Sequence, residues 1–314
     1  MARKDGEEFG FIETAALPLK HMGSFATLFR RFLASYEDDS VRIPCCGLWF
    51  AKRGEVDRTE EFSRSPKWIE PNHFQRTLAS CGYSYKAARG GWTLKVTAEN
   101  IGCPAGAMSL GLVSSDSTRS FEGGCYVASM AKPATPQDFT AGYVYAPHQS
   151  GHSEFALFGN EDCGRYETHE AALKAVKSMP VIPPVMDAVY YYHPLKSEVE
   201  VEPDIVHVYC TPLEAMRLIQ GYCFPTGERF TMSCMGIRGV SCDMTAWPYV
   251  NQDINGTFLC LGARGISNWE EEYVGFGMPM FKFEEVVVGM EKSRKGFPYK
   301  IFPKSIAHER NVRK

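Results

Sequence analysis

The sequence has no long hydrophobic run, no excess of positive charge and no close C-x-x-C pair of cysteines. Apolar runs such as Val286 to Gly289 are far shorter than the roughly 18 residues that a membrane span needs. The net charge of -3 and the pI of about 6.3 are unlike those of nucleic-acid-binding proteins. The first 20 residues contain no apolar segment typical of a secretory signal. We therefore expect a cytoplasmic protein whose partners include neither membranes nor nucleic acids.

Cysteine, in contrast, is abundant, with 11 in 314 residues. Cytoplasmic thiols stay reduced and an odd number cannot all pair within one chain, so a disulfide framework is not expected. Free cysteines are most often small buried apolar residues. Cys45, Cys46, Cys210 and Cys234 lie in or at the ends of strand-like runs and fit that structural role.

The hydrophobic periodicity alternates between helix and strand. Helices are expected within 24–37, 72–91, 167–180, 211–222 and 282–294, a short helix after Cys103, and strands within 41–53, 92–98, 187–195, 204–210, 229–234 and 256–264. This pattern predicts an α+β fold with mixed sheets, forming one unit over 1–314. We expect two intimately packed lobes, at about 1–120 and 163–300, separated by a loop-rich excursion at about 121–162. A basic tail follows at 303–314.

The two halves share an order of predicted elements. In the first half, strand 47–52, helix 73–89 and strand 92–97 precede a turn and Cys103. In the second half, strand 204–210, helix 212–220 and strand 229–234 precede a turn and Cys242. Sequence identity between the halves is negligible, and similar orders arise easily in mixed folds. A duplication and a coincidence therefore both remain open.

Several separated segments resemble one known family. The stretch "CGYSYKAARGGWTLKVTAENIGCPAGAMSLGL" at 81–112 is similar to the core motif of domain-of-unknown-function family 169, the archaeal-conserved-region proteins. Segments 202–220, 236–265 and 277–292 resemble later parts of that family in the same order, so the resemblance covers most of 70–300. The sequence departs from the pattern at about 121–163, and the family tends to be shorter before its first motif. The family has no settled activity to carry over, but its recurrent cysteines fall on Cys81, Cys103, Cys242 and Cys260.

The resemblance implies that these four cysteines act together as ligands. Four thiolates suit either a [4Fe–4S] cluster or tetrahedral zinc. Zinc sites usually draw ligands in close pairs, because short chelate loops lower the entropic cost of assembling the site. The long gaps between Cys81 and Cys103 and between Cys242 and Cys260 favour a cluster held between two lobes. Zinc and a metal-free protein remain the alternatives.

Polar and aromatic residues near these cysteines predict a ligand pocket. Arg238 and Arg264 are candidates to orient an anionic substrate through the guanidinium fork, with an exposed salt bridge as the equal alternative, and Asp243 beside Cys242 is a third catalytic candidate. Trp247, Tyr249 and Asp243 are candidates to line a pocket beside Cys242, although aromatic residues are equally at home in the core. The excursion at 121–162 is expected to cover this pocket as a lid.

We accordingly expect an iron–sulfur enzyme of the lyase or hydratase type that acts on a small anionic or aromatic molecule. An electron-transfer or cluster-sensing protein without a substrate is the second hypothesis, and a zinc-stabilised or metal-free binding protein the third. The sequence leaves the oligomeric state open, with a homo-oligomer as one alternative.

Overall fold

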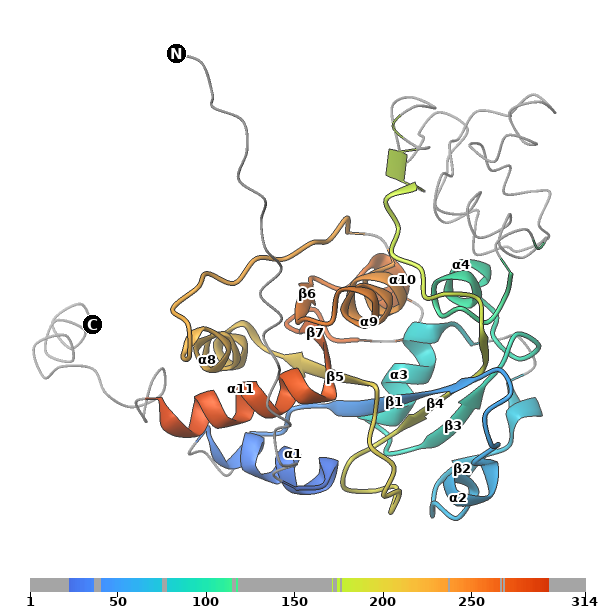
Figure 1. The fold of residues 1–314 in the computed structure, drawn as a ribbon, viewed down its shortest axis with the longest axis horizontal. Coiled ribbons are helices and arrows are strands. Elements are labelled where there is room, and N and C mark those ends of the chain that lie inside the picture. Colours follow the sequence, from blue (N-terminus) through green and yellow to red (C-terminus); the bar gives the residue numbers. More distant parts are fainter. Residues whose placement is uncertain are drawn as a thin grey trace, which may run out of the picture.

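The computed structural model describes residues 23–36, 41–74, 78–114, 117, 171, 174–175, 177–236, 238–265, 267 and 269–293. These residues form a mixed α+β fold around a seven-stranded sheet in the order β2-β3-β4-β1-β5-β7-β6 (Figure 1). The strands are β1 (Cys45–Lys52), β2 (Trp68–Ile69), β3 (Thr93–Val96), β4 (Met186–Tyr192), β5 (Ile205–Cys210), β6 (Asn255–Thr257) and β7 (Val274–Pro279). Neighbouring strands are antiparallel except β2 and β3, which are parallel. The predicted excursion at 121–162, the tail at 303–314 and half of the helix predicted at 167–180 lie outside the described residues.

Both halves of the chain contribute strands to this one sheet, which corrects the prediction of two lobes. Strand β1 pairs with β4 along one edge and with β5 along the other, so no sheet boundary separates the halves. The strand predicted at 229–234 is not a strand. The side-chain amide of Asn255 instead bonds the Ser233 backbone, accepting from its N–H and donating to its carbonyl, both at 2.9 Å. Without that strand the repeated order of elements is lost, and the fold gives no support to a duplication.

Side chains on the central strands alternate between two cores, because successive residues of a strand point to opposite faces. Cys45, Tyr190 and Val208 belong to one core, and Cys46, Tyr191 and Tyr209 to the other. The first core is covered by α1 (Phe25–Ala34), α8 (Pro212–Cys223) and α11 (Met280–Lys292), and the second by α3 (Ser80–Ala88), α4 (Pro104–Ser109) and η4 (Gly239–Ala246). Figure 1 shows α1 and α11 below the sheet and α3, α9 (Trp247–Asn251) and α10 (Leu261–Gly265) above it.

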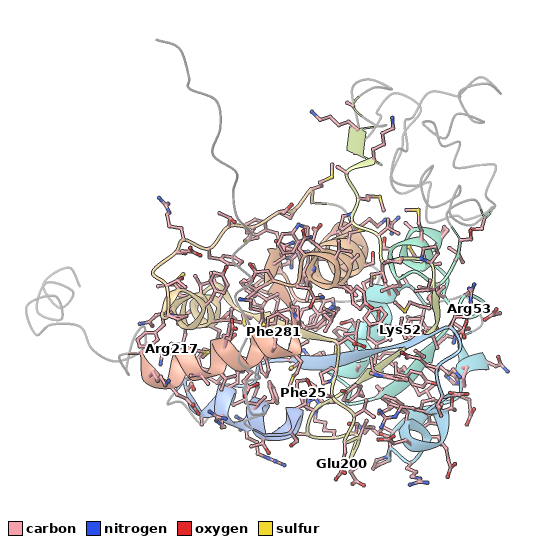
Figure 2. All side chains as sticks on the ribbon, viewed as in Figure 1. Phe25, Lys52, Arg53, Glu200, Arg217 and Phe281 are labelled. Atoms are coloured by element: carbon pink, nitrogen blue, oxygen red, sulfur yellow. The ribbon has the colours of Figure 1, made fainter. Side chains whose placement is uncertain are left out.

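The predicted starts of two helices are confirmed. Ser24 caps α1 by accepting from the Thr27 amide, and Thr211 forms a capping box with Glu214 at the start of α8. Farther along α8, Arg217 lies where that helix meets α11 (Figure 2). Its buried guanidinium donates to the Met290 carbonyl at 2.5 Å and to the Ser293 hydroxyl at 2.7 Å. This contact fixes the end of α11 on α8.

Two elements of the second core differ from the prediction. The helix predicted from residue 72 begins only at Ser80, because Leu78 forms a parallel bridge with Ile101 and its carbonyl accepts from the Gly102 amide. The segment 256–264, predicted as one strand, is strand β6 followed by α10. None of the helices in the described ranges is long and apolar enough to cross a membrane.

Candidate functional site

The four candidate ligands lie on short elements that cover one face of the sheet. Cys81 is the second residue of α3, and Cys103 caps α4, its sulfur accepting from the Gly106 amide at 3.3 Å. Cys242 lies inside η4, a π-helix, and Cys260 directly precedes α10, whose Ala263 amide bonds the Cys260 carbonyl. π-Helical turns are rare and are frequently found at functional sites.

The Leu78–Ile101 bridge brings together the two chain segments that carry Cys81 and Cys103. It joins the segment before α3 to the turn before α4, and the Gly102 amide donates to the Leu78 carbonyl at 2.9 Å. Cys81 follows Leu78 by three positions, and Cys103 directly follows Gly102. The interruption that shortens α3 is therefore the feature that brings these two segments together.

Glycines bring η4 close to the sheet and to the fourth cysteine. A Cβ at Gly277 of β7 would lie 1.7 Å from the Met244 carbonyl oxygen, so the π-helix rests directly on the strand backbone there. A Cβ at Gly239 would lie 2.7 Å from the Thr257 hydroxyl oxygen and 3.2 Å from the backbone nitrogen of Cys260. Only residues without a side chain allow these approaches. They seat Cys242 against the sheet and bring Cys260 to the start of the π-helix.

Arg238 interacts with three of the four thiols. Its Nη1 donates to the Cys103 sulfur at 3.0 Å. Burial raises the pKa of Cys81 to about 12, with Cys260 and Cys103 adding to the rise and Ser267 and Arg238 opposing it. Burial likewise raises the pKa of Cys242 to about 12, opposed by its 3.1 Å bond with Ser109 and by the charge of Arg238.

The four cysteines are thus linked electrostatically. The guanidinium acts on Cys81, Cys103 and Cys242, and Cys260 acts on Cys81. These contacts relate Cys81 to Cys103 and Cys260, and they relate Cys242 to the same guanidinium.

The backbone of Arg238 adopts a left-handed conformation, with φ 59° and ψ 30°. Such a conformation costs a residue with a side chain roughly 1–2 kcal/mol. Backbone strain of this kind persists where the surroundings impose it and clusters at functional sites. The strained residue here is the one that contacts a candidate ligand.

Among the residues that the structure describes, no group of three or more His, Cys, Asp or Glu side chains is placed so that it could hold a metal ion. Thiols are nevertheless the donor type that a cluster or zinc requires, and the charge of Arg238 lowers the pKa of Cys81 and Cys242 against the larger effect of burial. The hydroxyl of Tyr191 is buried without a hydrogen-bond partner among the described residues, and burial, with smaller contributions from Cys46 and Cys81, raises its pKa.

A cavity of about 160 Å³ opens beside one of these thiols, that of Cys242. Its walls are formed by residues from three segments: Ser178, Met179, Pro180, Ser233, Met235, Arg238, Cys242, Asp243 and Trp247. Arg238 therefore belongs to both the thiol group and the cavity, and the structure places Asp243 and Trp247 beside Cys242 in the cavity wall. The excursion expected to cover this cavity lies outside the described residues.

The carboxylate of Asp243 is the acidic group in this wall. Burial raises its pKa to about 7, and the Thr257 hydroxyl, which donates to its Oδ2 at 3.2 Å, opposes the rise. The Asn255 side chain donates to the Asp243 carbonyl at 2.9 Å and so fixes its backbone. A carboxyl group with such a pKa can both accept and donate a proton near neutral pH.

Arg264 has a different environment from Arg238. Its guanidinium donates to the carbonyls of Glu270 at 2.7 Å, Phe258 at 2.6 Å and Tyr273 at 2.9 Å. It is not among the residues that line the cavity. These bonds stabilise the loop that carries Cys260, and the function proposed below uses Arg238 alone.

A buried polar network beneath the thiols was not anticipated from the sequence. On β5, His207 bonds Ser84 of α3 through Nδ1 at 3.0 Å and Thr245 of η4 through Nε2 at 3.0 Å. Thr245 donates to the Val240 carbonyl, so it accepts from Nε2, and Nδ1 then accepts from Ser84. The Ser84 hydroxyl in turn accepts from Tyr209 at 2.5 Å.

His207 thereby ties together the two helices that carry Cys81 and Cys242. One sequence signal could have indicated this network. A residue with a hydroxyl group follows each of these cysteines by three positions, Ser84 after Cys81 and Thr245 after Cys242.

Comparison with known proteins confirms the family resemblance. The profile of the DUF169 family, described as uncharacterised ArCR, matches residues 47–289, and the chain belongs to this family. An uncharacterized protein of Methanocaldococcus jannaschii is 31% identical over 134 residues, which are 42% of this chain and 56% of that protein. The match therefore spans little more than half the length of this curated relative. No solved structure matches the chain.

Proposed function

We propose that this member of the DUF169 family holds a [4Fe–4S] cluster through Cys81, Cys103, Cys242 and Cys260 and acts on a small molecule in the adjoining cavity. The observation that carries the proposal is the position of Arg238, which bonds the Cys103 sulfur and also lines the cavity. A ligand held by this guanidinium would lie next to the thiol group. The proposed cytoplasmic location, where thiols stay reduced, suits such a site.

A bound cluster would supply Lewis-acid or one-electron chemistry at the cavity wall. Arg238 would hold an anionic group of the substrate, because its planar fork matches a carboxylate or phosphate. Asp243, buried in the same wall, would take or give a proton at its carboxyl group. Together these groups suit a lyase or hydratase, in which a proton and a leaving group are removed or added across a bond.

An electron carrier is a weaker candidate for the same residues. A carrier needs its cluster near a partner surface, whereas it does not need an arginine and a buried carboxyl group facing an adjacent cavity. Zinc remains the second candidate for the metal, because four thiolates also satisfy its tetrahedral preference. A zinc-stabilised binding protein would leave the cavity's role in ligand binding unchanged.

Anaerobic purification of the full chain tests the proposal. We expect brown protein with broad absorption in the visible blue and near-equal amounts of iron and acid-labile sulfide. Alanine at Cys81, Cys103, Cys242 or Cys260 should each lower the iron content sharply, since each removes a thiolate ligand. Cys223→Ala is the matched control, because Cys223 is half-buried at the end of α8, among the helices of the opposite sheet face.

Colourless protein with stoichiometric zinc would show that the bound metal is zinc and not a cluster. The assignment of the four cysteines as ligands would then stand. Equal metal content in all five variants would contradict the ligand assignment itself. Thermal unfolding of each variant separates metal loss from a general failure to fold.

A further inference from the structure

The cavity beside Cys242 presents two opposite charges and an apolar wall in a small volume. Arg238 contributes the cation and Asp243 the carboxylate, and Met179, Pro180 and Trp247 contribute apolar surface. A ligand that satisfies all three must carry an anionic group, a cationic donor and an apolar body. We propose that the cavity binds a small apolar α-amino acid, with Arg238 on its carboxylate and Asp243 on its ammonium group. The inference deepens the proposed function, on which it rests for the assignment of this cavity as a ligand site.

The two charged groups are held in fixed positions. The bond from Arg238 Nη1 to the Cys103 sulfur fixes the guanidinium at one wall. The Thr257 hydroxyl holds Oδ2 of Asp243, and Asn255 holds the Asp243 backbone. A carboxylate has about four acceptor sites on its two oxygens, so one bond from Thr257 leaves acceptor capacity for a donor in the cavity. Charged groups fixed in this way before binding reduce the entropy lost when a ligand binds.

Opposite charges also explain why a zwitterion suits the cavity better than a simple anion. A lone carboxylate would pair with Arg238 but would lie near the like charge of Asp243. A lone amine would pair with Asp243 and face the guanidinium. Only a ligand that carries both a carboxylate and an ammonium group pairs Arg238 and Asp243 at the same time. Neither side chain then faces a like charge on the ligand.

Size restricts the class further. The volume of about 160 Å³ is close to that of the engineered cavity of about 150 Å³ that holds one benzene molecule. A residue of the size of alanine to valine fits such a space, whereas the indole of tryptophan does not. Met179 and Met235 provide flexible thioethers on the apolar side, which adapt to branched aliphatic groups.

Calorimetric titration of the anaerobically purified full chain with three matched probes tests this inference. L-valine carries both charges, 3-methylbutanoate lacks the amine, and 2-methylpropylamine lacks the carboxylate. We expect valine to bind at least about tenfold more tightly than either analogue, and tryptophan not to bind. Asp243→Asn should remove the preference for valine over 3-methylbutanoate. Arg238→Met should remove the preference for valine over 2-methylpropylamine. Thermal unfolding of both variants checks that each is folded.

Two results would overturn the inference: 3-methylbutanoate binding as tightly as valine, or no binding of any amino acid from alanine to valine at millimolar concentration. Iron and sulfide are measured in the same samples, so the two proposals fail separately. Protein that contains the cluster but binds no amino acid overturns the ligand class alone. Protein that binds valine without iron overturns the cluster and retains the ligand class.

Discussion

Arg238 donates a hydrogen bond to the sulfur of Cys103 across 3.0 Å while its own backbone is held in the left-handed region. The two features are connected. The left-handed residue is the N-cap of the π-helix that starts at Gly239, and its side chain reaches Cys103 at the start of α4. The strain therefore places the guanidinium between the thiols and the cavity.

This strain can be measured with two substitutions at one position. Arg238→Gly and Arg238→Ala both remove the guanidinium, but only alanine keeps a Cβ in the left-handed conformation. We expect the glycine variant to be about 1 kcal/mol more stable than the alanine variant, since the Cβ penalty exceeds the extra chain entropy of glycine. Urea unfolding of both variants measures the difference. An alanine variant of equal or greater stability would mean that the backbone relaxes once the guanidinium is gone.

Arg264 is expected to contribute to stability and not to ligand binding. Arg264→Met removes the donor to three carbonyls and leaves them partly buried without it. We expect a loss of roughly 1–3 kcal/mol in the free energy of unfolding, the usual cost of unmade bonds. Denaturant unfolding and valine titration together check this. A variant with normal stability but no ligand binding would instead assign to Arg264 the orienting role that the sequence suggested.

The sequence predicted the outer elements of the fold better than the site. The capping residues Ser24 and Thr211 mark real helix starts, because an N-cap depends on local chemistry alone. The start of α3 was predicted wrongly, since the extended backbone at Leu78 is set by Ile101, which is distant in sequence. The false strand at 229–234 has a similar cause, because the side chain of Asn255 takes the place of a neighbouring strand.

The choice of the four cysteines as candidate ligands came from the family resemblance and not from their spacing. Strand β7 was missed because Gly275 and Gly277 disfavour a strand when judged by propensity. Their alternation is informative in hindsight, since glycines two apart lie on one face and permit the close approach of η4. His207 was missed because its role needs Ser84 and Thr245 from two other segments.

The close approach of η4 to β7 predicts a severe effect of a single methyl group. Gly277→Ala would put a Cβ 1.7 Å from the Met244 carbonyl oxygen, and neither backbone can move without disturbing the π-helix or the sheet. We expect a loss of at least about 3 kcal/mol of stability or a chain that does not fold. Gly265→Ala is the control, because a Cβ there meets open space. Equal melting temperatures for the two variants would show that η4 is not seated on the strand.

Acid is expected to destabilise the fold through two buried histidines. Burial lowers the pKa of His207 to about 3 and that of His193 to about 4, where Lys196 and Lys67 add to the effect. Both rings are therefore neutral in the fold, whereas the unfolded chain protonates them near pH 6.5. Stability from these groups is fully present above that pH and is lost as the pH falls toward 3. Each histidine contributes a slope of about 1.4 kcal/mol per pH unit in that window.

Urea unfolding at pH 7.5 and pH 5 measures this slope. His207→Gln keeps a side chain that can both donate and accept but removes the titration, so its stability should fall less between the two pH values than that of the natural chain. The side chains that bond His207, Ser84 and Thr245, are uncharged hydroxyls and offer a protonated ring no opposite charge. Protonation of this ring is therefore expected to disrupt the contact between α3 and η4 only as the pH approaches 3. Unchanged slopes in His207→Gln would show that this ring is not held neutral by the fold.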